Sequence, residues 1–253
     1  MFSQPHNSEA PSARPEPAAE VRLMGLVDFD ACLALQQRLV YEAGEWTDGR
    51  KVLLIAEHPA EITVGRQGSW KHIHFTERER TELRLNVRWV SRGGGCLLHL
   101  PGQLAVYPIV PLLHCRQSVG EYLNSLQAAI ISTFQELGIA AQGRPGRYGV
   151  WGRTGQLAAI GAAVKNWVAW HGAFINVNPG RLHRRIDSDP IECAPMSSLA
   201  VERGRTIKMT RVREALIRHI TVALGCPRYH LHTGHPLIPP SRQAIREPAR
   251  SAG

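Results

Sequence analysis

The sequence predicts an α/β fold of the α+β kind, in which helices pack on a mixed β-sheet, and three observations support it. Three stretches carry apolar residues at helical spacing, and six shorter runs are rich in β-branched and other apolar residues. The strand-like runs cluster between the helices, whereas a doubly wound parallel sheet would alternate with helices strictly. A chain of 253 residues allows one large domain or two small ones, and this pattern favours one.

The three predicted helices are bounded by residue types that are typical of helix caps. They run from about residue 28 or 30 to 44, from 118 to 138, and from 210 to 225. The second has the strongest signal, because Ser118 with Glu121 three residues later forms a capping box. A glycine lies at the end of each stretch and supplies a stop.

The predicted strands fill the intervals between these helices. They are Val52–Ile55, Ile62–Val64, Val87–Val90, Leu104–Val110, Leu157–Val164 and Val168–Val177. Only Lys165, Asn166 and Trp167 separate the last two runs, which is short enough for a β-hairpin.

We expect the folded domain to span residues 21–234, with a tail at each end. Residues 1–20 hold four prolines and no apolar period, which is typical of a disordered extension. Residues 235–253 carry four prolines among small and basic residues and are expected to form a loose tail. The sequence contains no internal repeat.

Composition excludes several classes of protein. The chain is 43% hydrophobic and 20% charged, without an apolar run near the roughly 20 residues of a membrane span. Its first residues lack the basic and apolar regions of a secretory signal. Five cysteines, an odd number without a CxxC pair, argue against a disulfide framework and for a reducing, cytoplasmic compartment.

The chain is basic, and its cations are almost all arginines. Lys+Arg number 30 against 21 for Asp+Glu, and only Lys51, Lys71, Lys165 and Lys208 are lysines. A basic surface favours an acidic partner such as a nucleic acid, an anionic membrane or an acidic carrier protein. No aromatic platform or helix-turn-helix accompanies the arginines, so nucleic-acid binding is not expected. The alternative is an arginine-rich composition without any partner.

Two segments carry residues suited to chemistry. Three glycines follow Arg92 after a strand-like run, and such a loop lets a ligand or another backbone approach closely. It lacks the dinucleotide fingerprint and the Walker sequence, and a purely structural turn is the alternative. Further on, Cys193 lies in a polar, proline-flanked loop, where it is a candidate nucleophile rather than a core cysteine.

No metal site is expected. Three histidines near the end of the chain and a pair after the second predicted strand lack a cysteine or carboxylate at suitable spacing. These histidines are His230, His232, His235, His72 and His74.

An ordered set of motifs spans about 140 residues of the predicted domain. The motifs are Glu57-His58-Pro59, Thr63–Gln67, Arg92-Gly93-Gly94, His99, Pro101–Leu104, Tyr107–Ile109, Arg144-Pro145-Gly146, Gly149-Val150-Trp151, Ala159-Ile160-Gly161, His171-Gly172, Asn176–Asn178, Cys193 and Ser197–Leu199. In these motifs the chain resembles the lipoyl(octanoyl) transferases, that is, the octanoyl-[acyl-carrier-protein]:protein N-octanoyltransferases. The resemblance implies the fold of the biotin and lipoate protein ligases.

The resemblance also implies a reaction, its partners and its residues. Cys193 would take an octanoyl group from acyl carrier protein as a thioester, without a cofactor. It would pass the group to a lysine of a lipoyl-dependent enzyme subunit or of the glycine-cleavage H protein. Neither a nucleic acid nor a membrane would take part. The implied substrate-binding residues are Arg66, Arg92, Gly93, Gly94, Gly95, Cys96, Leu97, Leu98, His99, Ala159, Ile160, Gly161, His171, Gly172, Ala173 and Phe174.

The chain departs from the family pattern near the expected site. Gln156 stands where the family has a lysine that lowers the pKa of the cysteine, and an amide carries no charge. Leu97 and Leu100 replace a threonine and a glycine, which would narrow the acyl channel. Glu192-Cys193-Ala194 replaces Pro-Cys-Gly and puts an acidic group beside the thiol. A catalytically impaired paralogue that binds acyl groups or acyl carrier protein is therefore the alternative function.

Other residues could take over the missing roles. His99 or His171 could serve as the base, and each is equally well interpreted as a structural histidine. Lys165 is too far along its strand to replace the lysine, at about 30 Å for nine residues. Cys96 is a rival nucleophile, although a buried small residue is the simpler interpretation.

Overall fold

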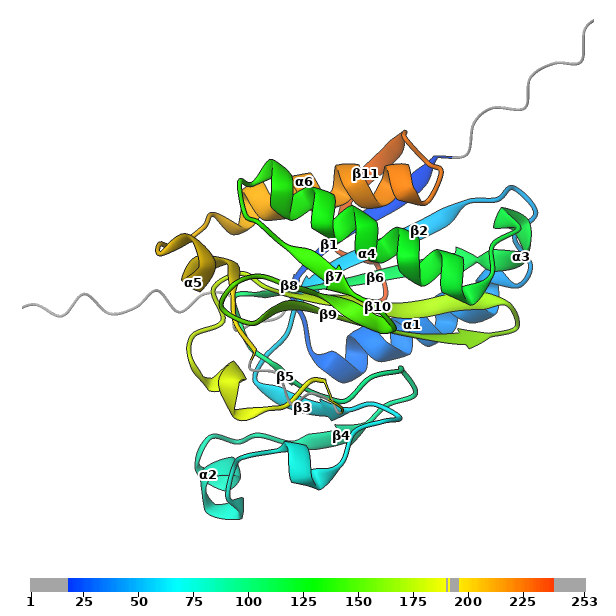
Figure 1. Cartoon of the computed structure of the whole chain (residues 1–253). Helices are drawn as coiled ribbons and strands as arrows, with labels where there is room; N and C mark the ends of the chain where they lie inside the picture. Colours follow the sequence, from blue (N-terminus) through cyan, green and yellow to red (C-terminus); the bar gives the residue numbers. More distant parts are fainter. Residues whose placement is uncertain (1–17, 190, 192–195, 239–253) are drawn as a thin grey trace, which may run out of the picture.

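The computed structural model describes residues 18–189, 191 and 196–238, which form two sheets and the helices that cover them (Figure 1). The larger sheet has eight strands in the order β11-β1-β2-β6-β10-β9-β8-β7. Their bounds are β1 Ala19–Leu26, β2 Lys51–Glu57, β6 Gln103–Pro111, β7 Gln142–Arg144, β8 Arg147–Trp151, β9 Gln156–Lys165, β10 Val168–Asn176 and β11 Tyr229–Thr233. The smaller sheet has the order β4-β3-β5, with β3 Glu61–Val64, β4 Val87–Trp89 and β5 Cys96–His99.

The larger sheet is mixed, as the sequence predicts. Strand β1 pairs in parallel with both β2 and β11, and β2, β6, β10, β9, β8 and β7 pair antiparallel in turn. The turn between β9 and β10 places both Asn166 and Trp167 at positive φ, so the predicted hairpin is confirmed. Lys165 is the last residue of β9 and lies at the hairpin end of the sheet.

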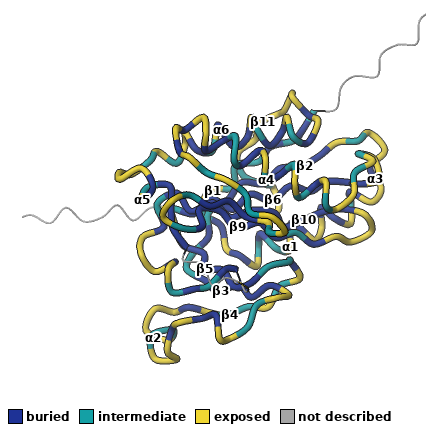
Figure 2. The backbone as a smooth tube through the Cα atoms, in the orientation of Figure 1, coloured by how far each residue is buried: buried dark blue, intermediate teal, exposed yellow. Residues whose placement is uncertain are grey.

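The helices divide between the two faces of the larger sheet. Helices α4 (Val119–Glu136) and α6 (Met209–Ala223) cover one face, while α1 (Phe29–Ala43) and the smaller sheet lie on the other (Figure 1). The central strands are buried along most of their length (Figure 2). The shorter helices are α2 Glu77–Glu82, α3 Leu112–Cys115 and α5 Leu199–Arg203, with 3-10 turns at Trp70–His72 and Leu182–Arg185.

All three predicted helices are present, and the first two have side-chain N-caps, whereas α6 starts at Met209 after Lys208, which makes no side-chain capping bond. Asp28 accepts from the backbone N–H of Ala31 at the start of α1. Ser118 and Glu121 make the reciprocal bonds of the predicted capping box before α4. In the described residues, no helix combines the length and apolarity that crossing a bilayer requires.

The expected ends of the folded domain need correction on both sides. Ala19 and Glu20 belong to β1, which pairs with β2 and β11, so the folded domain begins before the expected residue 21; residues 1–17 of the predicted extension lie outside the described residues. At the other end, residues 235–238 are not part of a loose tail. His235 and Ile238 form a β-bridge, and Ile238 packs against the core between the larger sheet and α1.

Candidate active site

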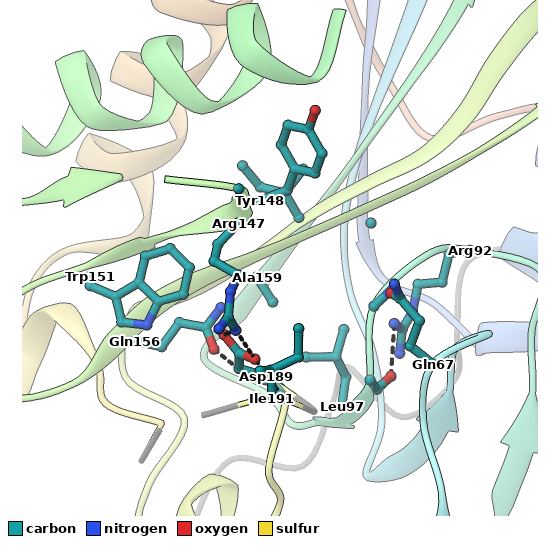
Figure 3. Close-up of a pocket in the computed structure, with 16 residues that line it drawn as sticks. Gln67, Arg92, Leu97, Arg147, Tyr148, Trp151, Gln156, Ala159, Asp189 and Ile191 are labelled. Carbon is teal, nitrogen blue, oxygen red and sulfur yellow. Dashed lines mark hydrogen bonds and ion pairs between the residues drawn. The ribbon is translucent and has the colours of Figure 1, made fainter. Parts of the chain in front are cut away.

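A cavity of about 210 Å³ opens between the glycine-rich loop, strands β8 and β9, and the segment around residue 189 (Figure 3). Its walls bring together residues that are far apart in the sequence. The lining residues are Gln67, Arg92, Gly94, Gly95, Leu97, Gly146, Arg147, Tyr148, Trp151, Gln156, Ala159, Ile160, Gly161, Ser188, Asp189 and Ile191. Arg92, Gly94, Gly95, Leu97, Ala159, Ile160 and Gly161 are among the residues that the sequence assigned to substrate binding.

The glycine-rich loop is docked directly on β9. The N–H of Gly93 donates to the carbonyl of Ala162 at 3.0 Å. A Cβ atom on Gly161 would lie only 2.4 Å from the carbonyl oxygen of Gly93, so only glycine allows this approach. The close contact fixes one wall of the cavity.

Gly161→Ala is expected to push the loop away from β9 and to destabilise the protein by about 1–3 kcal/mol. Urea unfolding measures the loss. Gly93→Ala is the matched control from the same contact, because a Cβ there would lie 3.7 Å from the carbonyl oxygen of Ala162, an ordinary van der Waals distance. Equal losses of stability in the two variants would contradict the tight docking.

Arg92 is a buried scaffold for the loop. Its guanidinium donates to the carbonyl oxygens of Gly93 and Gly95 at 3.1 and 3.0 Å. It also donates to the carbonyl and hydroxyl oxygens of Thr63, at 3.1 and 2.9 Å. Burial lowers the pKa of Arg92 to about 10, so the side chain stays charged at neutral pH. These bonds tie the loop to β3 of the smaller sheet.

A chain of buried hydrogen bonds continues from Thr63 across the domain. The hydroxyl of Thr63 lies 2.9 Å from Nε2 of His99, and Nδ1 of His99 lies 3.1 Å from the side-chain oxygen of Gln103. Gln103 donates to the side-chain oxygen of Asn176 at 2.8 Å, and Asn176 donates to the carbonyl of Ser197 at 2.9 Å. The network therefore connects the glycine-rich loop to the chain that follows residue 193.

Three buried histidines are held in their neutral form. Burial lowers the pKa of His58 to about 4 and that of His171 to about 3, and it holds the pKa of His99 well below 6.5. Both ring nitrogens of His99 already have hydrogen-bond partners. His171 has φ +57°, and its Nδ1 has no partner among the described residues. Neither His99 nor His171 lines the cavity, so the geometry favours structural roles for both.

Gln156, the first residue of β9, is 2% exposed and lies at the inner end of the cavity, beside Trp151 (Figure 3). Its side-chain oxygen accepts from the hydroxyl of Ser188, and its Nε2 donates to the carbonyl of Ala158 at 3.3 Å. The backbone of Gln156 pairs with the chain at Met196 and accepts from the N–H of Ser197 at 2.8 Å. An uncharged amide thus occupies a buried position next to the segment that follows residue 193.

The segment before residue 193 is held to the cavity wall by an ion pair. A guanidinium nitrogen of Arg147, which opens β8, lies 2.6 Å from Oδ2 of Asp189 (Figure 3). Both side chains are largely buried and both line the cavity. The cation of Arg147 is therefore engaged with a carboxylate of the site itself.

A buried carboxylate that sequence analysis missed supports the same region. Glu202 of α5 accepts from the backbone N–H groups of Arg153 and Thr154, each at 3.0 Å, and from the hydroxyl of Thr154 at 2.6 Å. The hydroxyl of Thr154 also lies 2.6 Å from that of Ser197. Through these bonds, Glu202 holds the turn at Arg153 and Thr154, which precedes Gln156, against the chain that follows residue 193. No motif signals this role, because it depends on contacts across 48 residues of sequence.

Cys193, the candidate nucleophile, lies outside the described residues, as do Glu192 and Ala194. The chain on both sides of it is described. Ile191 lines the cavity, and Met196 pairs with Gln156. The segment that carries Cys193 therefore starts and ends at this site.

The other predicted site residues lie around the cavity rather than in its wall. Cys96 and Leu98 pack into the core of the smaller sheet, and Ala173 packs under α4. Gly172 and Phe174 lie in the buried strand β10, where the ring centroid of Phe174 lies 4.9 Å from that of His99, with the two rings tilted by 59°. Gly93 and Arg66 line a second hollow that adjoins the cavity. Of the two leucine substitutions, Leu97 lines the cavity and Leu100 packs in the core of the smaller sheet.

The geometry also bears on the alternative roles considered for Cys96 and Lys165 and on the expectation that no metal site is present. Burial raises the pKa of the Cys96 thiol, which donates to the carbonyl of Ser69 at 3.4 Å, so the interpretation as a core cysteine is favoured. Lys165 lies at the opposite end of β9 from Gln156. Within residues 18–189, 191 and 196–238, no group of three or more His, Cys, Asp or Glu residues is arranged to hold a metal ion.

Comparison with known sequences identifies close relatives of the chain. Residues 28–221 match the lipoyl protein ligase A/B catalytic domain. An octanoyltransferase of Geobacter metallireducens is 32% identical over 217 residues, which cover 85% of this chain and 98% of that protein. An octanoyltransferase of Geotalea uraniireducens is 35% identical over 191 residues, covering 75% and 86%.

Solved structures agree in fold. A bi-partite lipoate protein ligase from Thermoplasma acidophilum has a TM-score of 0.64 at 14% identity, covering 87% of this chain and 89% of that chain. Lipoate-protein ligase A bound with ATP has a TM-score of 0.64 at 14% identity, covering 86% and 90%. The predicted α/β fold of the lipoate protein ligase kind is confirmed.

Proposed function

The chain belongs to the lipoyl protein ligase A/B catalytic-domain family, and we propose that it is an octanoyltransferase of protein lipoylation. Relatives with that activity in their names align with most of the chain, and one aligns over almost its whole length. They do not favour the alternative of a catalytically impaired paralogue. The same proposal includes octanoyl-acyl carrier protein as the donor and Cys193 as the residue that carries the acyl group.

The observation that carries the proposal is the position of the cavity. Its floor is largely apolar, formed by Leu97, Ala159 and Ile160, and suits an alkyl chain. Each buried methylene group of such a chain contributes about 0.8 kcal/mol. Both neighbours of the Cys193 segment, Ile191 and Met196, lie at the same site. An octanoyl group held on this floor would have its reactive end near that segment.

The proposed reaction has two transfers. The thiolate of Cys193 attacks the carbonyl carbon of octanoyl-acyl carrier protein, and a new C–S bond forms as the C–S bond to the carrier breaks. The carrier leaves as a thiolate and takes up the proton that Cys193 gave up. The uncharged amine of the acceptor lysine then attacks the octanoyl-cysteine, and a C–N bond forms as the C–S bond to Cys193 breaks. The proton that leaves the nitrogen passes to the departing thiolate, which restores the Cys193 thiol. The thioester intermediate keeps the acyl group activated between the two steps.

The proposed partners follow from the same chemistry. The donor is octanoyl-acyl carrier protein, and the acceptor is a lipoyl domain or the glycine-cleavage H protein. An acidic carrier suits a chain with a net charge of +9. Five cysteines without a CxxC pair fit a reducing compartment, so we propose that the reaction takes place in the cytoplasm.

Gln156 sets the expected pH dependence. The buried amide offers no positive charge to a neighbouring thiolate, so a thiol with a pKa near 8.5 would be only a few per cent ionised at pH 7. We expect the acylation rate of the natural chain to rise with pH up to about 8.5. Gln156→Lys is expected to lower the thiol pKa and to raise the rate at pH 7 about 10-fold, as for a shift of one pKa unit.

Stopped-flow acylation between pH 6 and 9 measures this effect. Gln156→Met is the control, because it has similar size and no charge, and it should leave the pH profile in place. The same profile in Gln156→Lys and the natural chain would contradict a role for charge at this position.

The experiment that tests the function itself is transfer to a purified lipoyl domain. With octanoyl-acyl carrier protein as donor, mass spectrometry should find one octanoyl group on the acceptor lysine. A lipoyl domain whose lysine is replaced by arginine should gain none. Absence of octanoylation at any pH with the natural chain would overturn the proposal.

A further inference from the structure

A second hollow of about 610 Å³ adjoins the cavity and opens on the surface. Gln67, Gly94, Tyr148, Ile160 and Gly161 line both hollows, which therefore adjoin one another and are together called the channel. The cavity follows β9 from Gln156 to Gly161, and the second hollow continues to Val164. Eight steps along the strand make the channel about 26 Å long. This is more room than an octanoyl chain alone requires.

The floor of the second hollow is an open strand edge. Strand β8 pairs with β9 only between Gln156 and Ala159, which leaves the following residues of β9 unpaired with β8. Gly93 takes one acceptor on this edge, the carbonyl of Ala162. Val119 and Leu123 of α4 form an apolar wall beside it. The hollow therefore offers both apolar surface and backbone of a strand edge, which suits an extended ligand that contains amide groups.

The charged side chain of this hollow is Arg66. It is exposed, and its guanidinium makes no ion pair or hydrogen bond with any residue that the structure describes. None of the side chains that line the second hollow is acidic. Arg147 of the cavity differs from Arg66, because its guanidinium is paired with the carboxylate of Asp189. Arg66 is free to bind an anion at the outer part of the channel.

We propose that the second hollow binds the phosphopantetheine arm of the thioester donor, with Arg66 at its phosphate. The proposal rests on the octanoyl transfer proposed above and extends it to the recognition of the donor. The arm carries a thioester at one end, two amide groups and a dimethyl-substituted carbon along its length, and a phosphate at the other end. Its thioester would lie where the second hollow meets the octanoyl cavity, and its amides would follow the open edge of β9.

The test compares donors with and without the phosphate. Octanoyl-phosphopantetheine and octanoyl-pantetheine differ only in that group. In the natural chain the phosphorylated donor should have a KM about 10-fold lower, as expected for a charged hydrogen bond to an anion. Arg66→Gln should remove this difference, and Arg66→Lys should keep part of it. Arg211→Gln, an exposed arginine of α6, is the control for the loss of one positive charge and should keep all of it.

Direct binding keeps this test separate from the proposed activity. Calorimetry with phosphopantetheine and with pantetheine should give the natural chain the same 10-fold preference, which Arg66→Gln abolishes. If that preference is present but no octanoyl transfer occurs, the subsite stands and the proposed function fails. If transfer occurs and Arg66→Gln weakens both donors equally, or neither, the subsite is overturned. Octanoyl-acyl carrier protein and octanoyl-coenzyme A, which share the arm, should both be weakened by Arg66→Gln.

Discussion

Cys193→Ser is expected to lower octanoyl transfer by about 1,000-fold or more. A serine hydroxyl is hardly ionised near neutral pH and cannot form the thioester through which the proposed reaction passes. The rate at which an octanoyl group appears on the lipoyl domain measures the loss. The substitution changes one atom, so the urea midpoint of the variant should stay close to that of the natural chain.

Two other cysteines supply controls for this prediction. Cys115 of α3 is partly buried at the end of the sheet remote from Gln156, and Cys96 is buried in the core of the smaller sheet. Cys115→Ser and Cys96→Ala should each retain most of the transfer rate. If Cys96→Ala lost transfer while Cys193→Ser kept it, the nucleophile would have to be reassigned.

Acidification to pH 5 is expected to destabilise the fold by several kcal/mol, because three histidines are buried in their neutral form. Their pKa values lie below 6.5 in the folded state, at about 4 for His58, about 3 for His171 and well below 6.5 for His99. The unfolded chain takes up these protons near pH 6.5, so the stabilising contribution is complete above that pH and is lost as the pH falls. At pH 5, His58 and His171 each account for about 2 kcal/mol, and the burial of His99 acts in the same direction.

Urea unfolding at pH 7.5 and pH 5 measures this loss. His171→Asn is the informative variant, because asparagine tolerates the positive φ of this residue and cannot take up a proton. Its loss of stability between the two pH values should be about 2 kcal/mol smaller than that of the natural chain. A natural chain that is equally stable at both pH values would show that these histidines are not buried as described.

The main elements of the fold could be predicted because their signals are local. The capping box at Ser118 and the apolar spacing behind it depend only on neighbouring residues, and α4 formed where they indicated. Strands β1, β5, β7, β8 and β11 were not predicted. Of these, β11 lies at the edge of the larger sheet and is exposed along its whole length. No apolar run marks such a strand.

The site could be predicted only in part, since sequence order does not tell which way a side chain points. The motif at β5 indicated that Cys96, Leu97 and Leu98 act together, but successive residues of a strand face opposite sides. Leu97 therefore reaches the cavity, whereas its two neighbours pack in the core of the smaller sheet. The glycine-rich loop could be singled out because consecutive glycines allow close backbone approach, which the loop makes to Gly161 of β9.

The residues that support the site could not be found from motifs. Ser188 bonds to Gln156 across 32 residues of sequence, and Glu202 bonds to Thr154 across 48. These contacts exist only once β9 and the chain after residue 193 are brought together. Because histidine titrates near neutral pH, the sequence suggested that His99 could be a base. Its burial and its two hydrogen bonds instead favour a structural role.

The most direct test of the proposed reaction is the mass of the protein after incubation with octanoyl-acyl carrier protein and no acceptor. The natural chain should gain one octanoyl group, peptide mapping should place it on Cys193, and addition of a lipoyl domain should discharge it. An octanoyl group on a different cysteine, or transfer to the lipoyl domain without any adduct on the enzyme, would contradict the cysteine thioester at the centre of the mechanism.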